Sequence, residues 1–197
     1  MESFNLNTAN DTLVGGTALR LTFGPNNVLE PDGTWKPEGL GAPPALSDGA
    51  GVIYPTVVFE VGYTESTVSL HNLAPIYLGP NTSIQLYVAV KIFKRRVGGT
   101  FAMLALIYSR ANAPVTTPVQ VISCGTAPIV QRSLPPLLQP LLTGVGIPPA
   151  PACNLAGLPQ YQLHLPLASI YQGVGVPPGL PLNFDLDLFQ LQRKIYA

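Results

Sequence analysis

Residues 54–93, YPTVVFEVGYTESTVSLHNLAPIYLGPNTSIQLYVAVKIF, decide the fold of this chain. The stretch begins with an apolar run that contains one carboxylate, Glu60, and breaks at Gly62. A polar turn, a segment with helical spacing of apolar residues and a longer run rich in β-branched residues follow, which predicts a strand, a short helix and a second strand. A glutamate within a buried strand costs several kcal/mol unless it is paired or binds a metal. Glu60 is therefore the leading candidate for a functional residue.

The segments on either side of this stretch predict further strands joined by turns. We expect one hairpin from residues 17–23 and 28–30, a loop over residues 31–51, a helix over residues 66–78, and a second hairpin from residues 84–93 and 100–110. Residues 119–124 and 161–165 predict strands, and residues 185–196 a closing amphipathic helix. The prediction is an α+β fold: a mixed, mainly antiparallel sheet of five to seven strands with one central short helix, a C-terminal helix and long Pro-rich loops. An all-β sandwich is the alternative.

Length and composition indicate one structural domain of 197 residues. We divide it into a core, residues 1–126, and a Pro-rich extension, residues 127–197, that wraps over the core or reaches a neighbouring subunit and ends in a short helix. The 22 prolines and 19 glycines exclude a helical bundle. Charged residues make up only 10% of the chain, against about 25% in ordinary globular proteins, which favours a homo-oligomer that hides part of its surface.

The charge balance and the N-terminal residues indicate where the protein works. The formal net charge is zero, so no overall attraction draws the chain to nucleic acid or to an anionic membrane. No apolar run approaches the length of a membrane-spanning helix, and the polar N-terminus has no features of a signal peptide. We expect an intracellular protein, cytoplasmic or nuclear. Cys124 and Cys153 are expected to be buried, reduced thiols, with a disulfide between them as the alternative.

The order of hairpin, Pro-Asp loop, Glu-bearing strand, short helix and long strand resembles the PD-(D/E)XK restriction-endonuclease-like superfamily, specifically its Uma-type branch and related fungal proteins. Pro31-Asp32 matches the Pro-Asp pair, and YPTVVFEVG at residues 54–62 matches the acid-bearing strand. The resemblance covers residues 17–110. It implies a restriction-endonuclease-like sheet in which Asp32 and Glu60 bind Mg²⁺ or Mn²⁺, with the Val61 carbonyl as a possible third ligand, for hydrolysis of DNA phosphodiesters.

The chain departs from this family at the catalytic lysine. Gly62 stands two residues after Glu60, and residues 66–78 contain His71 but neither Lys nor Arg. Lys36 and Lys91 are the nearest substitutes in the sequence, and Lys91 has the alternative of pairing with Glu60 within the sheet. The resemblance therefore indicates a degenerate member, a pseudo-nuclease.

Residues that contact nucleic acid are sought in the one basic run, Lys94, Arg95 and Arg96, and in the single tryptophan, Trp35. A solvated hairpin turn and an aromatic plug at the edge of the core are the plainer interpretations.

Three functions remain open. The first is a catalytically weak or inactive binding or assembly module on a nuclease fold. The second is an active Mg²⁺-dependent DNA hydrolase. The third is a structural, β-rich shell or coat subunit.

Overall fold

The computed structural model describes residues 13–16, 19–23, 27–43 and 45–196. It has an α+β fold with 18% helix and 31% strand, which confirms the predicted class over the all-β alternative. The strands are β1 (Leu13–Gly16), β2 (Leu21–Thr22), β3 (Val28–Leu29), β4 (Gly33–Pro37), β5 (Val57–Gly62), β6 (Leu86–Ile92), β7 (Ala102–Ser109), β8 (Gln120–Gly125), β9 (Leu142–Gly144), β10 (Gln162–Pro166) and β11 (Asn183–Asp187). The helices are α1 (Thr67–Tyr77), α2 (Leu167–Ile170) and α3 (Leu188–Ile195), with short 3₁₀ turns at Gln131–Ser133, Gln139–Leu141 and Pro159–Tyr161.

A seven-stranded sheet in the order β1-β4-β5-β6-β7-β8-β9 forms the centre of the molecule. Four of its strand pairs are antiparallel, and β5–β6 and β8–β9 are parallel, as expected for a mixed, mainly antiparallel sheet. Two small antiparallel sheets, β2–β3 and β10–β11, accompany it. Helix α1 connects the two parallel central strands, β5 and β6, so the stretch quoted at the outset folds as a strand–helix–strand unit.

Helix α1 begins at a side-chain cap and carries an internal proline. The hydroxyl of Ser66 accepts a hydrogen bond from the backbone N–H of Ser69 at 3.0 Å, which satisfies a free N–H in the first turn. Pro75 lies inside the helix, yet the helix continues to Tyr77. Because the lost hydrogen bond falls in the last turn, packing of Leu70, Ala74 and Tyr77 against the sheet holds the helix in place.

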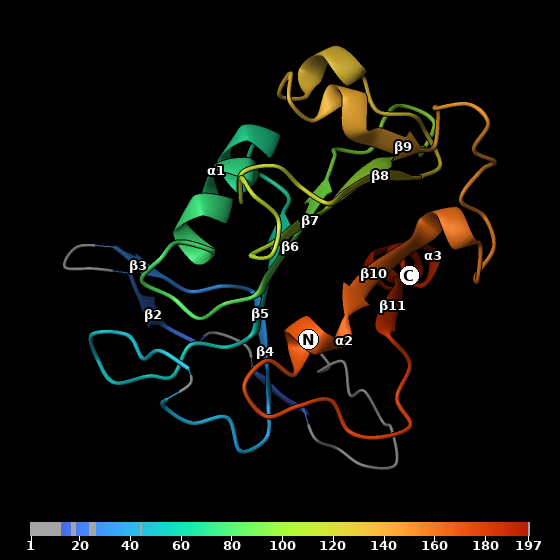
Figure 1. Cartoon of the computed structure of the whole chain (residues 1–197). Helices are drawn as coiled ribbons and strands as arrows, with labels where there is room; N and C mark the ends of the chain where they lie inside the picture. Colours follow the sequence, from blue (N-terminus) through green and yellow to red (C-terminus); the bar gives the residue numbers. More distant parts are fainter. Residues whose placement is uncertain (1–12, 17–18, 24–26, 44, 197) are drawn as a thin grey trace.

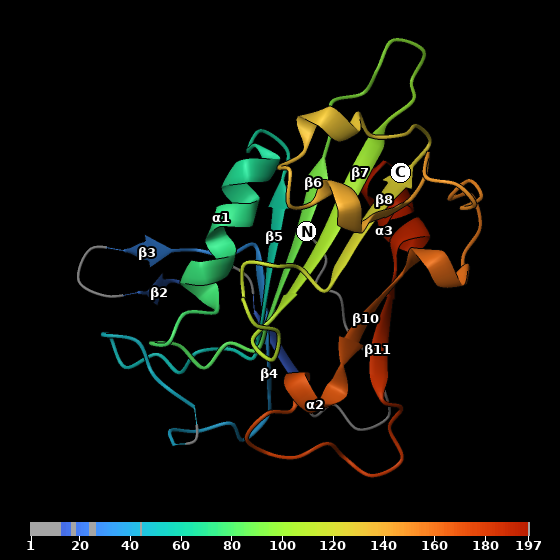
Figure 2. The same ribbon diagram turned by 45° about the horizontal axis from the view of Figure 1, so that its top comes forward.

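The central sheet separates two apolar cores. One core lies between the sheet and α1, and it also takes in β2 and the leucines of the segment after β8. The other core lies between the opposite face and the layer formed by β10, β11, α2 and α3. Figures 1 and 2 show α1 on one side of the sheet and this second layer on the other. Alternating residues of β6 serve the two cores, so all seven of its side chains are buried.

Two local predictions are wrong in part. Residues 31–51, expected as a loop, contain β4, which pairs with β1 on one side and β5 on the other. Residues 185–196, expected as one helix, begin in β11; the helix starts only after Asp187, whose carboxylate accepts the N–H groups of Phe189 and Gln190. In both places pairing with a distant strand outweighs the local pattern.

The extension after residue 126 is an integral part of the sheet and its cover. It contributes β9, which pairs in parallel with β8, and all of the layer on the second face. Cys124 and Cys153 lie in this second core, both buried and unbonded. The predicted first hairpin is present as β2–β3, although residues 17–18 and its turn residues 24–26 lie outside the described part of the chain.

Candidate functional site

Asp32 directly precedes β4 and lies opposite Glu60 of the neighbouring strand β5. Gly33 pairs with Phe59 in the antiparallel β4–β5 ladder, so the residue before Gly33 faces the residue after Phe59. The Oδ2 atom of Asp32 accepts the backbone N–H of Val61 at 2.7 Å, which fixes the Asp32 carboxylate beside β5. The structure thus brings together the two acids that the resemblance selected.

This carboxyl pair is electrostatically unfavourable when both groups are ionised. The pKa of Glu60 is raised to about 7: burial is the main cause, the hydrogen bond from Tyr77 lowers the pKa, and the neighbouring carboxylates of Asp32 and Glu65 add to the rise. The carboxyl groups of Asp32 and Glu60 are close enough to interact through a hydrogen bond. Like charges this close are destabilising, so near neutral pH Glu60 favours its protonated form or a bound cation beside it.

A layer of tyrosines lies between α1 and the sheet and extends away from Glu60. The Tyr77 hydroxyl donates a hydrogen bond to Glu60 Oε1. The rings of Tyr77 and Tyr87 have centroids 5.1 Å apart, and those of Tyr87 and Tyr108 are stacked at 5.5 Å. The Tyr108 hydroxyl contacts His71 Nδ1 at 2.8 Å, and burial lowers the pKa of this histidine. Burial raises the pKa of all three tyrosines, so they remain neutral donors at neutral pH.

Gly62, two residues after Glu60, packs directly against a side chain of α1. A Cβ atom built at Gly62 would lie 2.8 Å from Leu70 Cδ1 and 3.3 Å from two other atoms of the same side chain. Leu70 is fully packed between α1 and the sheet, with 2% of its surface exposed. The space next to Glu60 on this face is therefore filled by an apolar helix residue.

Lys91 occupies the neighbouring position on β6. It is in parallel register with Gly62 of the adjacent strand β5. Its Nζ atom donates to the Tyr63 carbonyl at 2.6 Å and lies 5.7 Å from the centroid of the Phe93 ring. Burial lowers the pKa of Lys91, and Glu65 opposes that change. Among the described residues no ion pair links Lys91 to Glu60, so the predicted pairing is replaced by a hydrogen bond to the backbone.

The other residues that sequence analysis selected lie apart from the carboxyl pair. Lys36 is on β4 in register with Val14, four residues from Asp32, or about 13 Å along a strand. Trp35 packs edge-on against Phe59, with ring centroids 4.3 Å apart, on the face opposite α1. The basic turn with Lys94, Arg95 and Arg96 connects β6 and β7 and is exposed.

Sequence reasoning missed Leu70 and Tyr77, the two side chains that define the surroundings of Glu60. Their spacing along the helix marked them only as core residues, and burial on the α1 side of the sheet bears that out. The tyrosine hydroxyl was the one available signal, because a buried phenol requires a hydrogen-bond partner and the nearby strand carries a buried acid.

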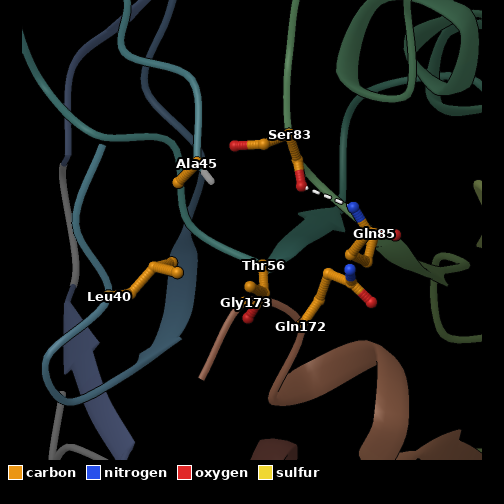
Figure 3. A pocket seen from close by; sticks show the side chains of 7 residues that line it. All are labelled: Leu40, Ala45, Thr56, Ser83, Gln85, Gln172 and Gly173. Carbon is orange, nitrogen blue, oxygen red and sulfur yellow. Dashed lines mark hydrogen bonds between the residues drawn. The ribbon is translucent and has the colours of Figure 1, made fainter. Parts of the chain in front are cut away.

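Two pockets elsewhere in the fold are small. One of about 90 Å³ lies before the start of β5 and β6 and is lined by Leu40, Ala45, Thr56, Ser83, Gln85, Gln172 and Gly173 (Figure 3). Two of its polar side chains already make hydrogen bonds within the protein: the Thr56 hydroxyl donates to the Ile170 carbonyl, and Gln85 Nε2 donates to the Ser83 carbonyl. The other, about 220 Å³, lies beside the end of α1 and is lined by Phe23, Asn27, Pro75, Ile76, Gly79, Pro80, Asn81 and Thr82. Both are smaller than the roughly 300–1,000 Å³ of typical ligand pockets.

The donor set at the carboxyl pair fits a weakly held divalent cation. Within the described ranges, no three His, Cys, Asp or Glu side chains gather in an arrangement suited to a metal ion. Asp32 and Glu60 each have one carboxylate oxygen engaged by a protein donor and a second oxygen that these bonds leave available. Mg²⁺ is commonly held by one or two carboxylates together with waters, so two ligands from the protein are compatible with it.

Comparisons with protein-family models, with curated proteins and with solved structures find no match to this chain. In the part of the chain that the structure describes, no helix has the length and apolar character needed to span a membrane.

Proposed function

We propose that this chain has the scaffold of a metal-dependent nuclease and acts as a binding or assembly module with little or no cleavage activity. The observation that carries the proposal is the packing of Leu70 against Gly62, which fills the place of the family's lysine. A positioned cation that stabilises charge on a transition state contributes about 10²–10³ in rate, or about 3–4 kcal/mol. The nearest substitute, Lys91, is held by the Tyr63 carbonyl.

The carboxyl pair is the part of a nuclease site that the chain retains. Asp32 and Glu60 would hold Mg²⁺ or Mn²⁺ through their available oxygens. A metal bound there would polarise a phosphodiester and lower the pKa of a bound water. The chain's own contribution is to orient the two ligands: the Val61 N–H fixes Asp32, and the Tyr77 hydroxyl fixes Glu60. Cation binding would displace the proton that Glu60 holds near pH 7, so the affinity should fall in acid.

The experiment combines metal titration with a cleavage assay. Wild-type protein, Asp32→Asn and Glu60→Gln are titrated with Mn²⁺ by calorimetry and incubated with linear and single-stranded DNA and RNA, with metal and with chelator. Glu38→Gln is the matched control, because Glu38 is an exposed carboxylate just after β4. We expect Mn²⁺ binding by the wild type and the control, loss of binding in both site variants, and cleavage at background level. Chelator-sensitive cleavage that Glu60→Gln abolishes would overturn the proposal of an inactive site.

Cleavage that chelator and Glu60→Gln abolish would favour the second candidate function, a Mg²⁺-dependent DNA phosphodiester hydrolase. The observation that supports it is the register of Lys91 with Gly62, which puts a lysine on the neighbouring strand on the same face as Glu60. In that case Lys91→Met would remove the cleavage activity while Lys36→Met would retain it.

Assembly is the form of binding that the surface favours. Several large apolar side chains of the extension are exposed: Leu137 at 45%, Leu155 at 62% and Leu182 at 88%. They lie in segments stiffened by proline, which lose little conformational entropy when they dock. We propose a homo-oligomer formed through this extension. Light scattering at micromolar concentration should give a mass above the 20.9 kDa of one chain, and a monomer would contradict it.

A further inference from the structure

A second surface, independent of the carboxyl pair, gathers half of the basic residues of the chain. Lys94, Arg95 and Arg96 lie in the β6–β7 turn, and Arg193 and Lys194 lie in the last turn of α3. These five account for half of the ten lysines and arginines, although the chain as a whole has no net charge. Neither β6 through β7 nor residues 188–197 contain an acidic residue.

A contact between an arginine and a tyrosine joins the two basic segments, which are about a hundred residues apart in the sequence. The Arg95 guanidinium lies 4.5 Å from the centroid of the Tyr196 ring, directly after α3. The Tyr196 ring packs in turn on Phe101, the residue before β7, with centroids 3.9 Å apart. Figure 2 shows the β6–β7 turn and the end of α3 at the same end of the sheet. We call the five cations with Tyr63 and Tyr196 the basic end.

No carboxylate of the described residues neutralises the charges of the basic end. Across the described residues, the one ion pair joins His164 to Asp185, so none of the five cations has a carboxylate within 4 Å. Arg96 instead donates to the Pro128 carbonyl at 2.5 Å, which ties the turn to the loop after β8 without consuming its charge. All five side chains are exposed.

An exposed aromatic ring lies near Tyr196, the residue that Arg95 contacts. Tyr63 follows the end of β5, with 59% of its surface exposed, and it is close enough to Tyr196 to influence the pKa of that phenol. Burial is the main cause that raises the pKa of Tyr196, and the Arg95 charge opposes it. Cations interleaved with exposed rings are the combination that binds single-stranded nucleic acid, because phosphates meet the cations while unpaired bases stack on the rings.

We propose that the basic end binds single-stranded nucleic acid, and that it does so on the α3 side of the sheet, away from the carboxyl pair. Glu60 contacts Tyr77 in the core on the α1 side, whereas Tyr196 packs against the core on the opposite side. Binding at the basic end needs no metal. Binding at the basic end is therefore expected whether or not the carboxyl pair binds a metal.

The test measures binding of a labelled single strand of about 20 nucleotides by fluorescence anisotropy, in chelator, over a range of salt concentrations. With five phosphate contacts, log K should fall with log salt at a slope of up to about −3.5. The variants Lys94→Gln/Arg95→Gln and Arg193→Gln/Lys194→Gln should each reduce the magnitude of the slope by about 1.4. Lys36→Gln/Arg132→Gln removes two cations from elsewhere and should bind like the wild type.

Tyr63→Ala separates stacking from charge. It should weaken binding of the single strand roughly tenfold, while the salt slope stays at the wild-type value. Thermal unfolding of each variant shows whether it is folded. If Arg193→Gln/Lys194→Gln does not fold, Lys94→Gln/Arg95→Gln alone still tests the proposal. Wild-type affinity in both double variants, equal binding of a duplex of the same length, or variant-sensitive binding to phosphatidylserine vesicles without binding to the strand would each overturn the proposal.

Discussion

Replacing Glu60 by glutamine tests the electrostatic cost of the carboxyl pair. Burial and the facing Asp32 raise the pKa of Glu60 from its ordinary 4.5 to about 7. At about 1.4 kcal/mol per pKa unit the difference corresponds to about 3 kcal/mol, which solvent screening at this partly exposed carboxyl reduces to about 1–2 kcal/mol. Because the folded-state pKa is the higher one, the stability that this group contributes is fully present below pH 4.5 and is lost as the pH rises through 7.

Glutamine keeps the acceptor for the Tyr77 hydroxyl and removes the charge. We therefore expect Glu60→Gln to raise the free energy of unfolding at pH 8 by about 1–2 kcal/mol and to have little effect below pH 4.5. Urea unfolding, followed by tryptophan fluorescence at several pH values between these limits, measures the difference. Glu38→Gln controls for the loss of a surface charge. A Glu60→Gln variant that is less stable than the wild type at pH 8, or a pH dependence that it shares with the wild type, would refute the reasoning.

Three further predictions concern single side chains at the carboxyl pair and in the sheet. Tyr77→Phe removes a hydrogen bond that lowers the pKa of Glu60, so the midpoint of the pH dependence of stability should move above pH 7. The free energy of unfolding should fall by about 1–2 kcal/mol. A midpoint that moves down would contradict this. Gly62→Lys should not produce cleavage activity, and it should lower the free energy of unfolding by about 1–3 kcal/mol because its Cβ meets Leu70. Calorimetry should show a smaller loss of stability in the double variant Gly62→Lys/Leu70→Ala. Gly144→Ala should lower the melting temperature strongly and the free energy of unfolding by more than about 3 kcal/mol. The reason is that Gly144 has a φ of +93° and its Cβ would collide with a carbonyl of β8. A mild effect in differential scanning fluorimetry would show that β9 can shift.

The central part of the fold could be predicted because its signals are local. The β6–β7 hairpin has two long apolar runs around a basic turn with two glycines, and the structure forms it in continuous register from Leu86↔Ser109 to Ile92↔Met103. Helix α1 begins with a cap at Ser66 as its sequence indicates. In these segments the local pattern and the tertiary contacts favour the same structure.

The strands that the sequence did not reveal are stabilised by partners far along the chain. Strand β4 lies among prolines and glycines, and its pairing with β1 and β5 makes it a strand. Strand β9 is only three residues long and depends on β8. Strand β11 pairs with β10 through the register His164↔Asp185, in a segment whose charge order favours a helix. Short windows of sequence contain no information about such pairings.

For the candidate site, the sequence identified the acids but not what surrounds them. The Pro-Asp pair and the strand with Glu60 were enough to select Asp32 and Glu60, which the antiparallel register then places face to face. That Leu70 fills the space beside Gly62 is a property of packing between a helix and a sheet, and no residue pattern states it. The same holds for Arg95 and Tyr196, which meet only because α3 returns to the end of the sheet.

The second core has a consequence for how the chain folds during synthesis. Trp35, near the start of the sheet, packs against both Phe59 and Phe184, so one tryptophan joins the earliest central strands to a strand made more than a hundred residues later. Within the described residues, the layer that covers the apolar face with Val88 and Met103 is formed mainly by residues 153–196. Nearly all of the described chain must therefore be translated before that face is buried. Until then the nascent sheet presents a surface suited to chaperones, and the fluorescence of Trp35 would report the moment at which the cover closes.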